Sequence, residues 1–332
     1  MGQLGALGSP QAHPPRLVSE GPYRVLVAPE VPPHIAGAVR SGGGTVVGPG
    51  QGAQGLIWLS GPERLPQVLT SERELRWCQL PVAGVEKFFA EGVIGADLRP
   101  DLAWACAKGS YAKPVAEHAL ALTLALLRAL PERAKARTWG KQAGETLFGA
   151  RVTLVGGGGI TTELLHLLEP FGVSTTVVRR RAQGSAVPPL PGSPRVVGTD
   201  QLAHALQGAR VVVLALSLTP ESEGLIGSEE LSAMGPEAFL VNVARGRHVV
   251  TPALVDALTA GRIAGAALDV TDPEPLPDGH PLWSLGNCLI TPHSADTAEM
   301  VAPLLAERAR ENTARARQGL ALLGAVDPAA GY

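Results

Sequence analysis

Residues 150–168, ARVTLVGGGGITTELLHLL, decide the fold expected for this chain. A short β-branched run leads directly into four glycines, and an apolar stretch with helical spacing follows. Strand, glycine-rich turn and helix in this order open a dinucleotide-binding α/β domain. Gly156 and Gly158 would form the turn, and the backbone N–H groups of Gly159 and Ile160 would face a pyrophosphate at the start of the helix.

Strand and helix patterns keep alternating after this unit. Strands are expected at 173–178, 210–216, 238–243, 263–268 and 287–290, and helices at 160–169, 200–207, 228–233 and 252–260. The Pro-rich stretch 187–194, VPPLPGSP, interrupts them as a surface loop. Repeated βα units of this length predict a Rossmann-type, doubly wound parallel sheet.

The N-terminal part has a similar alternation. YRVLVAPE, GTVVG, QGLIWLS and RWCQLPV are short β-rich runs separated by Gly and Pro, which indicates a second open α/β sheet. A long Ala/Leu-rich helix is expected at 115–130, and another at 298–320 near the end of the chain. Because 332 residues exceed the usual size of one core, we expect two domains.

Composition narrows the possible partners. Lys and Arg number 28 against 30 Asp and Glu, so no net field favours nucleic acid or an anionic membrane. No apolar run reaches roughly 18 residues, the first 20 residues lack a signal-peptide core, and no membrane anchor is expected. Three dispersed cysteines without a CxxC pair predict neither disulfides nor a metal site, so a cytoplasmic location is expected. Residues 1–20 are interpreted as a flexible tail.

Arginines occupy the position that would select the cofactor. The strand ending at Val178 is followed by Arg179, Arg180 and Arg181, where an NAD-binding domain would carry an acidic residue for the ribose hydroxyl. Arginine pairs with a 2′-phosphate, so NADP(H) is favoured, with NAD(H) still possible. The alternative is a solvated basic loop. Thr161 replaces the third glycine of the motif and is expected to push helix and strand slightly apart.

Three residues near the ends of later strands suggest carbonyl reduction. Arg245 has the planar fork that binds a carboxylate and its neighbouring carbonyl, and His293 would deliver a proton to a carbonyl oxygen. Glu274 would orient that imidazole. Singly, each has an ordinary alternative as a surface ion pair, a structural histidine or a solvated carboxylate. Asp269 is either a hydrogen-bond acceptor for a nicotinamide carboxamide or a turn former.

The same region carries a family resemblance. The run VNVARGRHVVTPALVDALTAGRIAGAALDVTDPEPLPDGHPLW, followed by ITPH, resembles the signature region of the D-isomer-specific 2-hydroxyacid dehydrogenases. Within that family the chain is most similar to bacterial glyoxylate/hydroxypyruvate reductases, in GLIWLSGPERL, in the arginines after the second nucleotide-domain strand and in AVDPAAGY. The resemblance covers residues 23–332.

The resemblance implies a divided chain. A dinucleotide-binding domain at 113–295 would be inserted into a flavodoxin-like substrate domain formed by 21–112 and 296–332, with the active site in the cleft. The implied reaction is NAD(P)H-dependent reduction of a small 2-keto acid to the D-2-hydroxy acid. A homodimer formed through the nucleotide domain is also implied.

The resemblance also assigns residues. Arg245 would orient the substrate, His293 would be the acid/base and Glu274 its support. In LPVAGVE, the backbone N–H groups of Ala83, Gly84 and Val85 would bind the substrate carboxylate. Trp58 would close the pocket over a small substrate, unless it belongs to the core.

Some features depart from the family pattern and leave alternatives open. Ser217 stands where proline is usual, and Ala215 where histidine is frequent, both near the expected nicotinamide ribose. Glu274 argues against formate dehydrogenases, which typically pair the histidine with glutamine. Only a helix and a short tail follow His293, which disfavours a phosphoglycerate dehydrogenase with a regulatory domain. A non-catalytic nucleotide-sensing protein stays open because fold does not determine function, and so does a dehydrogenase of another 2-hydroxy acid.

Overall fold

The computed structural model describes residues 22–95, 98–180, 190–328 and 331. The chain divides into two compact units: unit 1 is 1–107 with 302–332, and unit 2 is 108–301. The sequence places these boundaries at 112/113 and 295/296, and the role of unit 1 as a substrate domain stays a prediction. The proposed tail at 1–20 and Arg181 lie outside the described residues.

Unit 1 contains a five-stranded sheet in the order β2-β1-β3-β4-β5, and all its paired strands are parallel. This is the flavodoxin-like order, with the switch at β1. Its elements are β1 Tyr23–Ala28, α1 Pro33–Ser41, β2 Gly44–Val47, β3 Gly55–Trp58, α2 Leu65–Ser71, β4 Trp77–Gln79, α3 Glu86–Ala90 and β5 Ala103–Ala105. Sequence patterns indicated four of these strands, and β5 went unrecognised.

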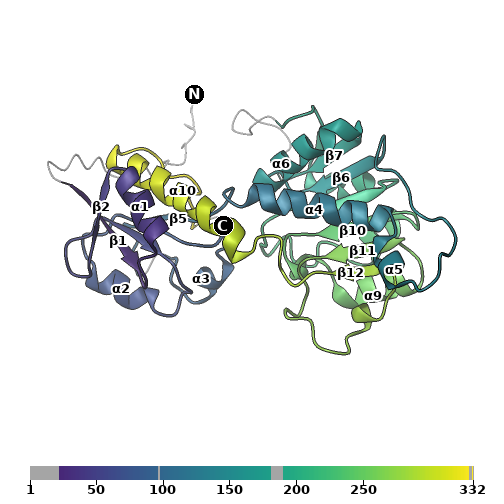
Figure 1. The fold of residues 1–332 in the computed structure, drawn as a ribbon, viewed down its shortest axis with the longest axis horizontal. Helices are drawn as coiled ribbons and strands as arrows, with labels where there is room; N and C mark the ends of the chain where they lie inside the picture. The colour runs from purple at the N-terminus through teal and green to yellow at the C-terminus, as the bar shows by residue number, and fades with distance from the viewer. Residues whose placement is uncertain (1–21, 96–97, 181–189, 329–330, 332) are drawn as a thin grey trace, which may run out of the picture. The chain divides into compact units, whose positions relative to one another are not determined.

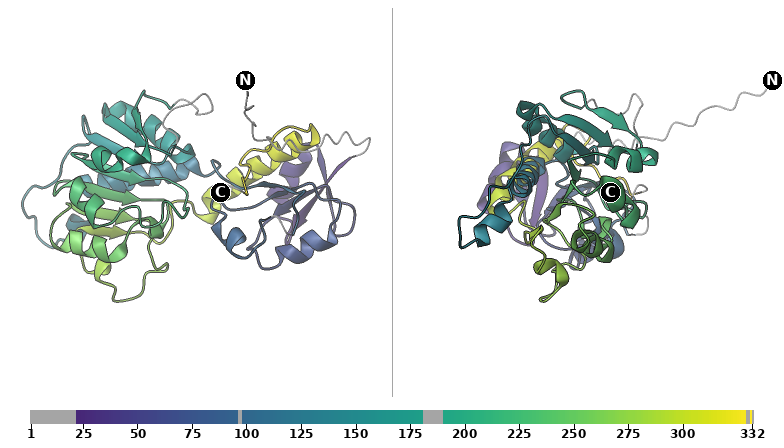
Figure 2. Two further views of the ribbon diagram at one scale, coloured as in Figure 1. Left: turned by 180° about the vertical axis from the view of Figure 1, so that it is seen from behind. Right: turned by 90° about the vertical axis from the view of Figure 1, so that its right-hand side faces the viewer.

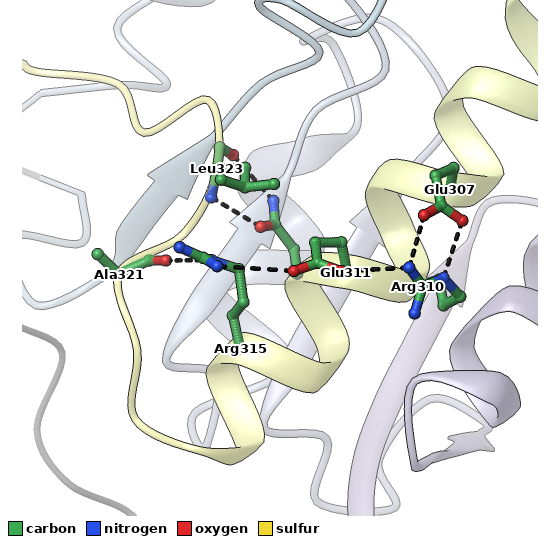
Figure 3. A network of polar contacts seen from close by, with 7 residues as sticks. Glu307, Arg310, Glu311, Arg315, Ala321 and Leu323 are labelled. Atoms are coloured by element: carbon green, nitrogen blue, oxygen red, sulfur yellow. Dashed lines mark hydrogen bonds and ion pairs between the residues drawn. The ribbon is translucent and has the colours of Figure 1, made fainter.

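The last helix, α10 Ala298–Arg317, lies in the layer of α1 within unit 1 (Figures 1 and 2). The fully buried Asn312 donates to Gln79 Oε1 of β4 at 2.7 Å. Its side chain also exchanges hydrogen bonds with the backbone of Leu323, and Arg315 Nε donates to Ala321 O (Figure 3). The segment after α10 therefore folds back and packs against α10 itself.

Unit 2 contains a seven-stranded sheet in the order β12-β11-β10-β9-β6-β7-β8, and all its paired strands are parallel. The elements are α4 Ala112–Leu127, α5 Leu130–Lys135, β6 Arg151–Val155, α6 Gly159–Leu168, η1 Glu169–Phe171, β7 Ser174–Val178, β8 Arg195–Val197, η2 Thr199–Gln201, α7 Leu202–Leu206, β9 Val211–Leu214, α8 Ser228–Met234, β10 Phe239–Asn242, η3 Gly246–His248, α9 Thr251–Thr259, β11 Gly265–Leu268, η4 Pro281–Trp283 and β12 Cys288–Ile290.

Helices cover both faces of this sheet. One buried cluster joins α4 and α6 to residues such as Leu154, Val213 and Val241, and a second joins α7, α8 and α9 to residues such as Val212 and Leu240. The strand residues alternate between the two clusters because successive side chains of a strand point to opposite faces. Figure 1 shows α4 and α6 together on one face. The doubly wound fold class is confirmed.

The strand order of unit 2 reverses at β6, whose neighbours are β7 and β9. Ligands of open α/β sheets bind at this switch, outside the carboxyl ends of the strands. Residues 190–194 of the Pro-rich stretch form a loop as expected, whereas 187–189 lie outside the described residues. No helix in the described part of the chain has the length and apolarity needed to cross a membrane.

Candidate active site

The glycine-rich turn follows β6 at the switch point. Gly156 has φ +118, and a Cβ there would lie 2.1 Å from the Ala215 carbonyl oxygen at the end of β9. No atom lies within 4 Å of the Cβ position at Gly158, the N-cap of α6. A tight turn, open space and a helix N-terminus starting at Gly159 together suit a pyrophosphate. The residues present therefore fit a dinucleotide cofactor.

The Thr161 side chain is hydrogen-bonded to this turn. It is fully buried, and its hydroxyl donates to the Gly156 carbonyl oxygen at 3.0 Å. The bond satisfies a backbone acceptor of the turn. The slight separation of helix and strand expected for Thr161 stays a prediction.

Arg179 and Arg180 directly follow β7 beside the turn. A Cβ at Gly157 would lie 2.7 Å from Arg179 Cδ, so the arginine stem passes close to the glycine backbone. The pKa of Glu221 is lowered mainly by a hydrogen bond with Thr219. The positive charge of Arg180 adds a smaller contribution in the same direction. The arginines and the glycine-rich turn thus share one end of the sheet.

Three predicted residues come together at the carboxyl ends of neighbouring parallel strands. Asp269 directly follows β11, and register pairs Leu268 with Asn242 of β10 and with Ile290 of β12. Arg245 follows β10, and His293 follows β12. They share the sheet edge that carries Gly156.

The turn after β10 is tightly packed. Arg245 is half-buried, and its carbonyl accepts a hydrogen bond from Asn242 Nδ2 at 2.9 Å. A Cβ at Gly246 would lie 1.9 Å from the Thr271 carbonyl oxygen, in the segment leading to Glu274. The absent side chain lets the backbone carrying Arg245 touch the backbone preceding Glu274.

We expect Gly246→Ala to lower the free energy of unfolding by about 3 kcal/mol or more, because the new methyl would overlap backbone atoms that cannot rotate away. Urea unfolding would measure this. Gly286→Ala is the matched control, since no atom lies within 4 Å of its Cβ position. Equal unfolding midpoints for the two variants would contradict the close packing.

His293 and Glu274 form a hydrogen-bonded pair. His293 Nδ1 lies 2.6 Å from Glu274 Oε1, and the two side chains are 43% and 41% exposed. His293 has φ +50, a left-handed conformation that is uncommon outside glycine and is found at functional positions. Its backbone N–H donates to the Asp269 carbonyl oxygen at 2.8 Å. With Nδ1 on the glutamate, Nε2 is the nitrogen available to another group.

Asp269 holds the turn that carries His293. Its carboxylate accepts hydrogen bonds from the Thr291 hydroxyl at 2.6 Å, from Ser294 N at 2.9 Å and from Ala295 N at 3.2 Å. Burial alone would raise its pKa, but these bonds, together with one from His118, lower it to about 2. At 2% exposure, Asp269 is an ionised anchor of this turn. This geometry favours a local structural role, and contact with a nicotinamide stays a prediction.

Two neighbours of the candidate site were not singled out in the sequence. His118 of α4 has Nε2 3.1 Å from Thr291 Oγ1 and 3.3 Å from Asp269 Oδ1. The pKa of Asp296 is raised above its usual value, chiefly by burial, although the charges of His293 and Arg245 oppose this shift. Asp296 is therefore a second titratable group near the candidate acid/base. Only its position three residues after His293 could have indicated it.

The predicted substrate residues of unit 1 have mixed surroundings. Trp58 is 1% exposed, packs in the core, and donates from Nε1 to the Gly61 carbonyl at 2.8 Å. This burial favours the core role over the predicted substrate contact. Ala83 is exposed and Gly84 half-buried, while Val85 anchors the loop in the core. Among the residues that the structure describes, no cluster of His, Cys, Asp or Glu is arranged to hold a metal ion.

Comparison with known proteins decides the family. Residues 120–295, more than half of the chain, match the family model described as D-isomer specific 2-hydroxyacid dehydrogenase, NAD binding domain. The chain belongs to the D-isomer specific 2-hydroxyacid dehydrogenase family. Membership supports NAD(P)-dependent 2-hydroxyacid dehydrogenase activity and a nicotinamide cofactor in unit 2.

Individual relatives of this family member differ in how much they align. An uncharacterized protein in the proB 3′ region of Corynebacterium melassecola is 37% identical over 273 residues, 80% of this chain and 87% of that protein. Glyoxylate reductase/hydroxypyruvate reductase of Homo sapiens is 37% identical over 186 residues, 54% of this chain and 56% of its own. The chain therefore spans about half the length of that reductase.

A solved structure of the family matches nearly the whole chain. The D-isomer specific 2-hydroxyacid dehydrogenase from Xanthobacter autotrophicus Py2, in complex with NADPH and MES, has a TM-score of 0.79 and 26% identity. The match covers 94% of this chain and 100% of that one. The two-unit architecture is thus the family's.

Proposed function

We propose that this chain reduces a small 2-keto acid of the glyoxylate or hydroxypyruvate type to the D-2-hydroxy acid, using NADPH in preference to NADH. The observation that carries the proposal is the 2.6 Å pair between His293 and Glu274 at the sheet edge that also carries Arg245 and the glycine-rich turn. The human reductase gives the substrate class by its name, although it matches over about half its length.

His293 is the proposed acid/base. Reduced nicotinamide, when bound, supplies a hydride to the carbonyl carbon. His293 Nε2 donates a proton to the carbonyl oxygen, on which negative charge develops. Glu274 accepts a hydrogen bond from Nδ1 and stabilises the imidazolium that donates the proton. In the reverse direction the neutral imidazole accepts the proton from the hydroxyl.

Arg245 is the proposed substrate-orienting residue. Its guanidinium can make two parallel hydrogen bonds to the carboxylate and carbonyl oxygens of a 2-keto acid. In unit 1, we assign the backbone N–H groups of Ala83, Gly84 and Val85 to the substrate carboxylate. The chirality of the product from hydroxypyruvate tests the reaction: D-glycerate supports the proposal, and L-glycerate or a racemate would contradict it.

Cofactor preference is assigned to Arg179 and Arg180. Both follow the strand next to the glycine-rich turn, and Val178, rather than an acidic residue, ends that strand. Guanidinium groups here would pair with the 2′-phosphate of NADPH, while the backbone at Gly156, Gly158, Gly159 and Ile160 would hold the pyrophosphate.

The variant Arg179→Asp with Arg180→Ala should raise the KM for NADPH about a hundredfold, because two charge-assisted contacts are lost and one repulsive charge is gained. The KM for NADH should change only a few-fold. Initial rates with both cofactors would measure this. Arg195→Asp, at the exposed amino end of β8, is the control. Equal losses for both cofactors would show that these arginines do not distinguish the phosphate.

We also propose a homodimer formed through unit 2. Trp139 is 94% exposed, Phe148 64% and Leu130 53%, so large apolar side chains gather on one stretch of chain. Exposed apolar surface of this kind marks protein interfaces. A cytoplasmic location stays a prediction.

Trp139→Asp should convert the dimer to a monomer at micromolar concentration, because a charge would be buried in an apolar interface. Light scattering coupled to size exclusion would give the mass. Leu167→Asp, at a residue of α6 that is 37% exposed, is the control. A monomeric wild type, or a Trp139 variant that stays dimeric, would contradict the assignment.

A further inference from the structure

The loop between β9 and α8, residues 215–227, is folded back on itself and fastened to the turn after Arg245. The Ser222 hydroxyl accepts from Thr219 N at 2.8 Å and lies 3.0 Å from Ser217 O, which closes the loop internally. Gly224 N donates to Arg247 O at 2.8 Å, and Ile226 N donates to His248 O at 2.9 Å. We call residues 215–227 the β9–α8 loop.

The side chain of His248, which lies outside the loop in sequence, packs against the loop backbone. It is fully buried, with Nδ1 2.9 Å from Ser222 O and Nε2 3.3 Å from Leu216 O. Carbonyl oxygens only accept hydrogen bonds, and a neutral imidazole has one N–H. Nδ1, at the shorter distance, is the better placed donor to the Ser222 carbonyl, and Nε2 can donate to the Leu216 carbonyl only when the ring carries a second proton. The ring thus lies between the backbone of Leu216 and that of Ser222.

The β9–α8 loop borders the place assigned to the cofactor. A Cβ at Gly156 would lie 2.1 Å from Ala215 O and 3.1 Å from Leu216 Cβ, so the loop begins against the glycine-rich turn. On its other side, His248 N donates to Arg245 O at 3.2 Å. His248 thus connects the β9–α8 loop to the turn that carries the proposed substrate arginine.

We propose that His248 is a positioning residue that holds the β9–α8 loop in its cofactor-binding conformation. The inference rests on the proposed function, because that function places NADPH beside this loop. A loop held in place before binding loses less conformational entropy when the ligand arrives. His248 itself touches neither substrate nor the reacting atoms, so its removal should weaken cofactor binding and leave the chemical step largely unchanged.

Three variants test this. His248→Leu replaces the imidazole with an apolar side chain of similar size and removes both ring nitrogens. His248→Asn keeps an N–H donor near the Nδ1 position, and His248→Gln keeps a polar side chain but moves the donor away from Ser222. The readouts are NADPH titration, amide hydrogen exchange of residues 216–224 without cofactor, and the thermal midpoint. Gln provides a result if the Leu variant fails to fold.

We expect His248→Leu to raise the Kd for NADPH about tenfold, the effect of losing one buried hydrogen bond, and to accelerate exchange in 216–224 by a similar factor. Asn should restore both values to within about threefold, Gln should be intermediate, and kcat should change less than Kd. A lower thermal midpoint with unchanged Kd and unchanged loop exchange would overturn the proposal, because it would make His248 an ordinary core residue. If the wild type bound no NADPH, the proposed function would fail. Amide exchange in residues 216–224 would still test whether His248 holds the β9–α8 loop.

Discussion

His293→Ala is expected to remove nearly all turnover of 2-keto acids while NADPH binds almost as tightly as to the wild type. Loss of a positioned acid/base typically slows a reaction by about 10² to 10⁴. Cofactor affinity should persist because the glycine-rich turn and the arginines follow β6 and β7, whereas His293 follows the outermost strand β12, with β9, β10 and β11 between β6 and β12. Steady-state rates and an NADPH titration would measure the two effects separately.

His204→Ala is the matched control for this prediction, because His204 lies on the exposed face of α7. Its activity should equal that of the wild type. Glu274→Gln, which removes the charge beside the imidazole, should lower kcat by about ten- to a hundredfold. Normal turnover by the His293 variant would end the acid/base assignment, whatever the behaviour of Glu274.

Arg245→Ala is expected to lower kcat/KM for glyoxylate or hydroxypyruvate by about 10² to 10³, because an arginine that binds the carboxylate and stabilises charge on the carbonyl oxygen acts in both binding and the transition state. Arg245→Lys should recover only part of the loss, since a lysine cannot make two parallel bonds. Rates over a range of substrate concentrations separate the two parameters.

Arg247→Ala is the control for Arg245. Its guanidinium pairs with Glu223 at 2.5 Å at the surface, with 53% and 48% of the two side chains exposed, and such pairs contribute little. Activity within about threefold of the wild type is expected. A loss at Arg247 as large as that at Arg245 would indicate a disturbed turn rather than a lost substrate contact.

Much of the fold could be predicted because strand and helix patterns alternate strongly around Gly156. The strands that went unrecognised are short. β5 and β8 have three residues each, too few to show a period, and β8 is defined mainly by its pairing with β7. Such edge strands depend on a neighbour distant in sequence, which local patterns do not report.

The site could be predicted only in part. Residues that follow parallel strands must share one edge of the sheet, so the order of strands and helices along the chain was enough to group Arg245, Asp269 and His293. His118 could not be grouped with them in this way, because it contacts Thr291 across 173 positions of sequence. Two of the bonds that make Asp269 an anchor come from the backbone N–H groups of Ser294 and Ala295, and such groups are carried by every residue except proline, so no sequence pattern identifies them.

The most direct test of the account is the loss of reduced-nicotinamide absorbance when wild-type protein is mixed with glyoxylate or hydroxypyruvate, with NADPH and NADH in parallel and the His293→Ala variant beside it. We predict rapid oxidation of NADPH, slower oxidation of NADH, and almost none by the variant. No oxidation of either cofactor by the wild type across several 2-keto acids would contradict a reductase and favour a protein that binds the nucleotide without turning it over.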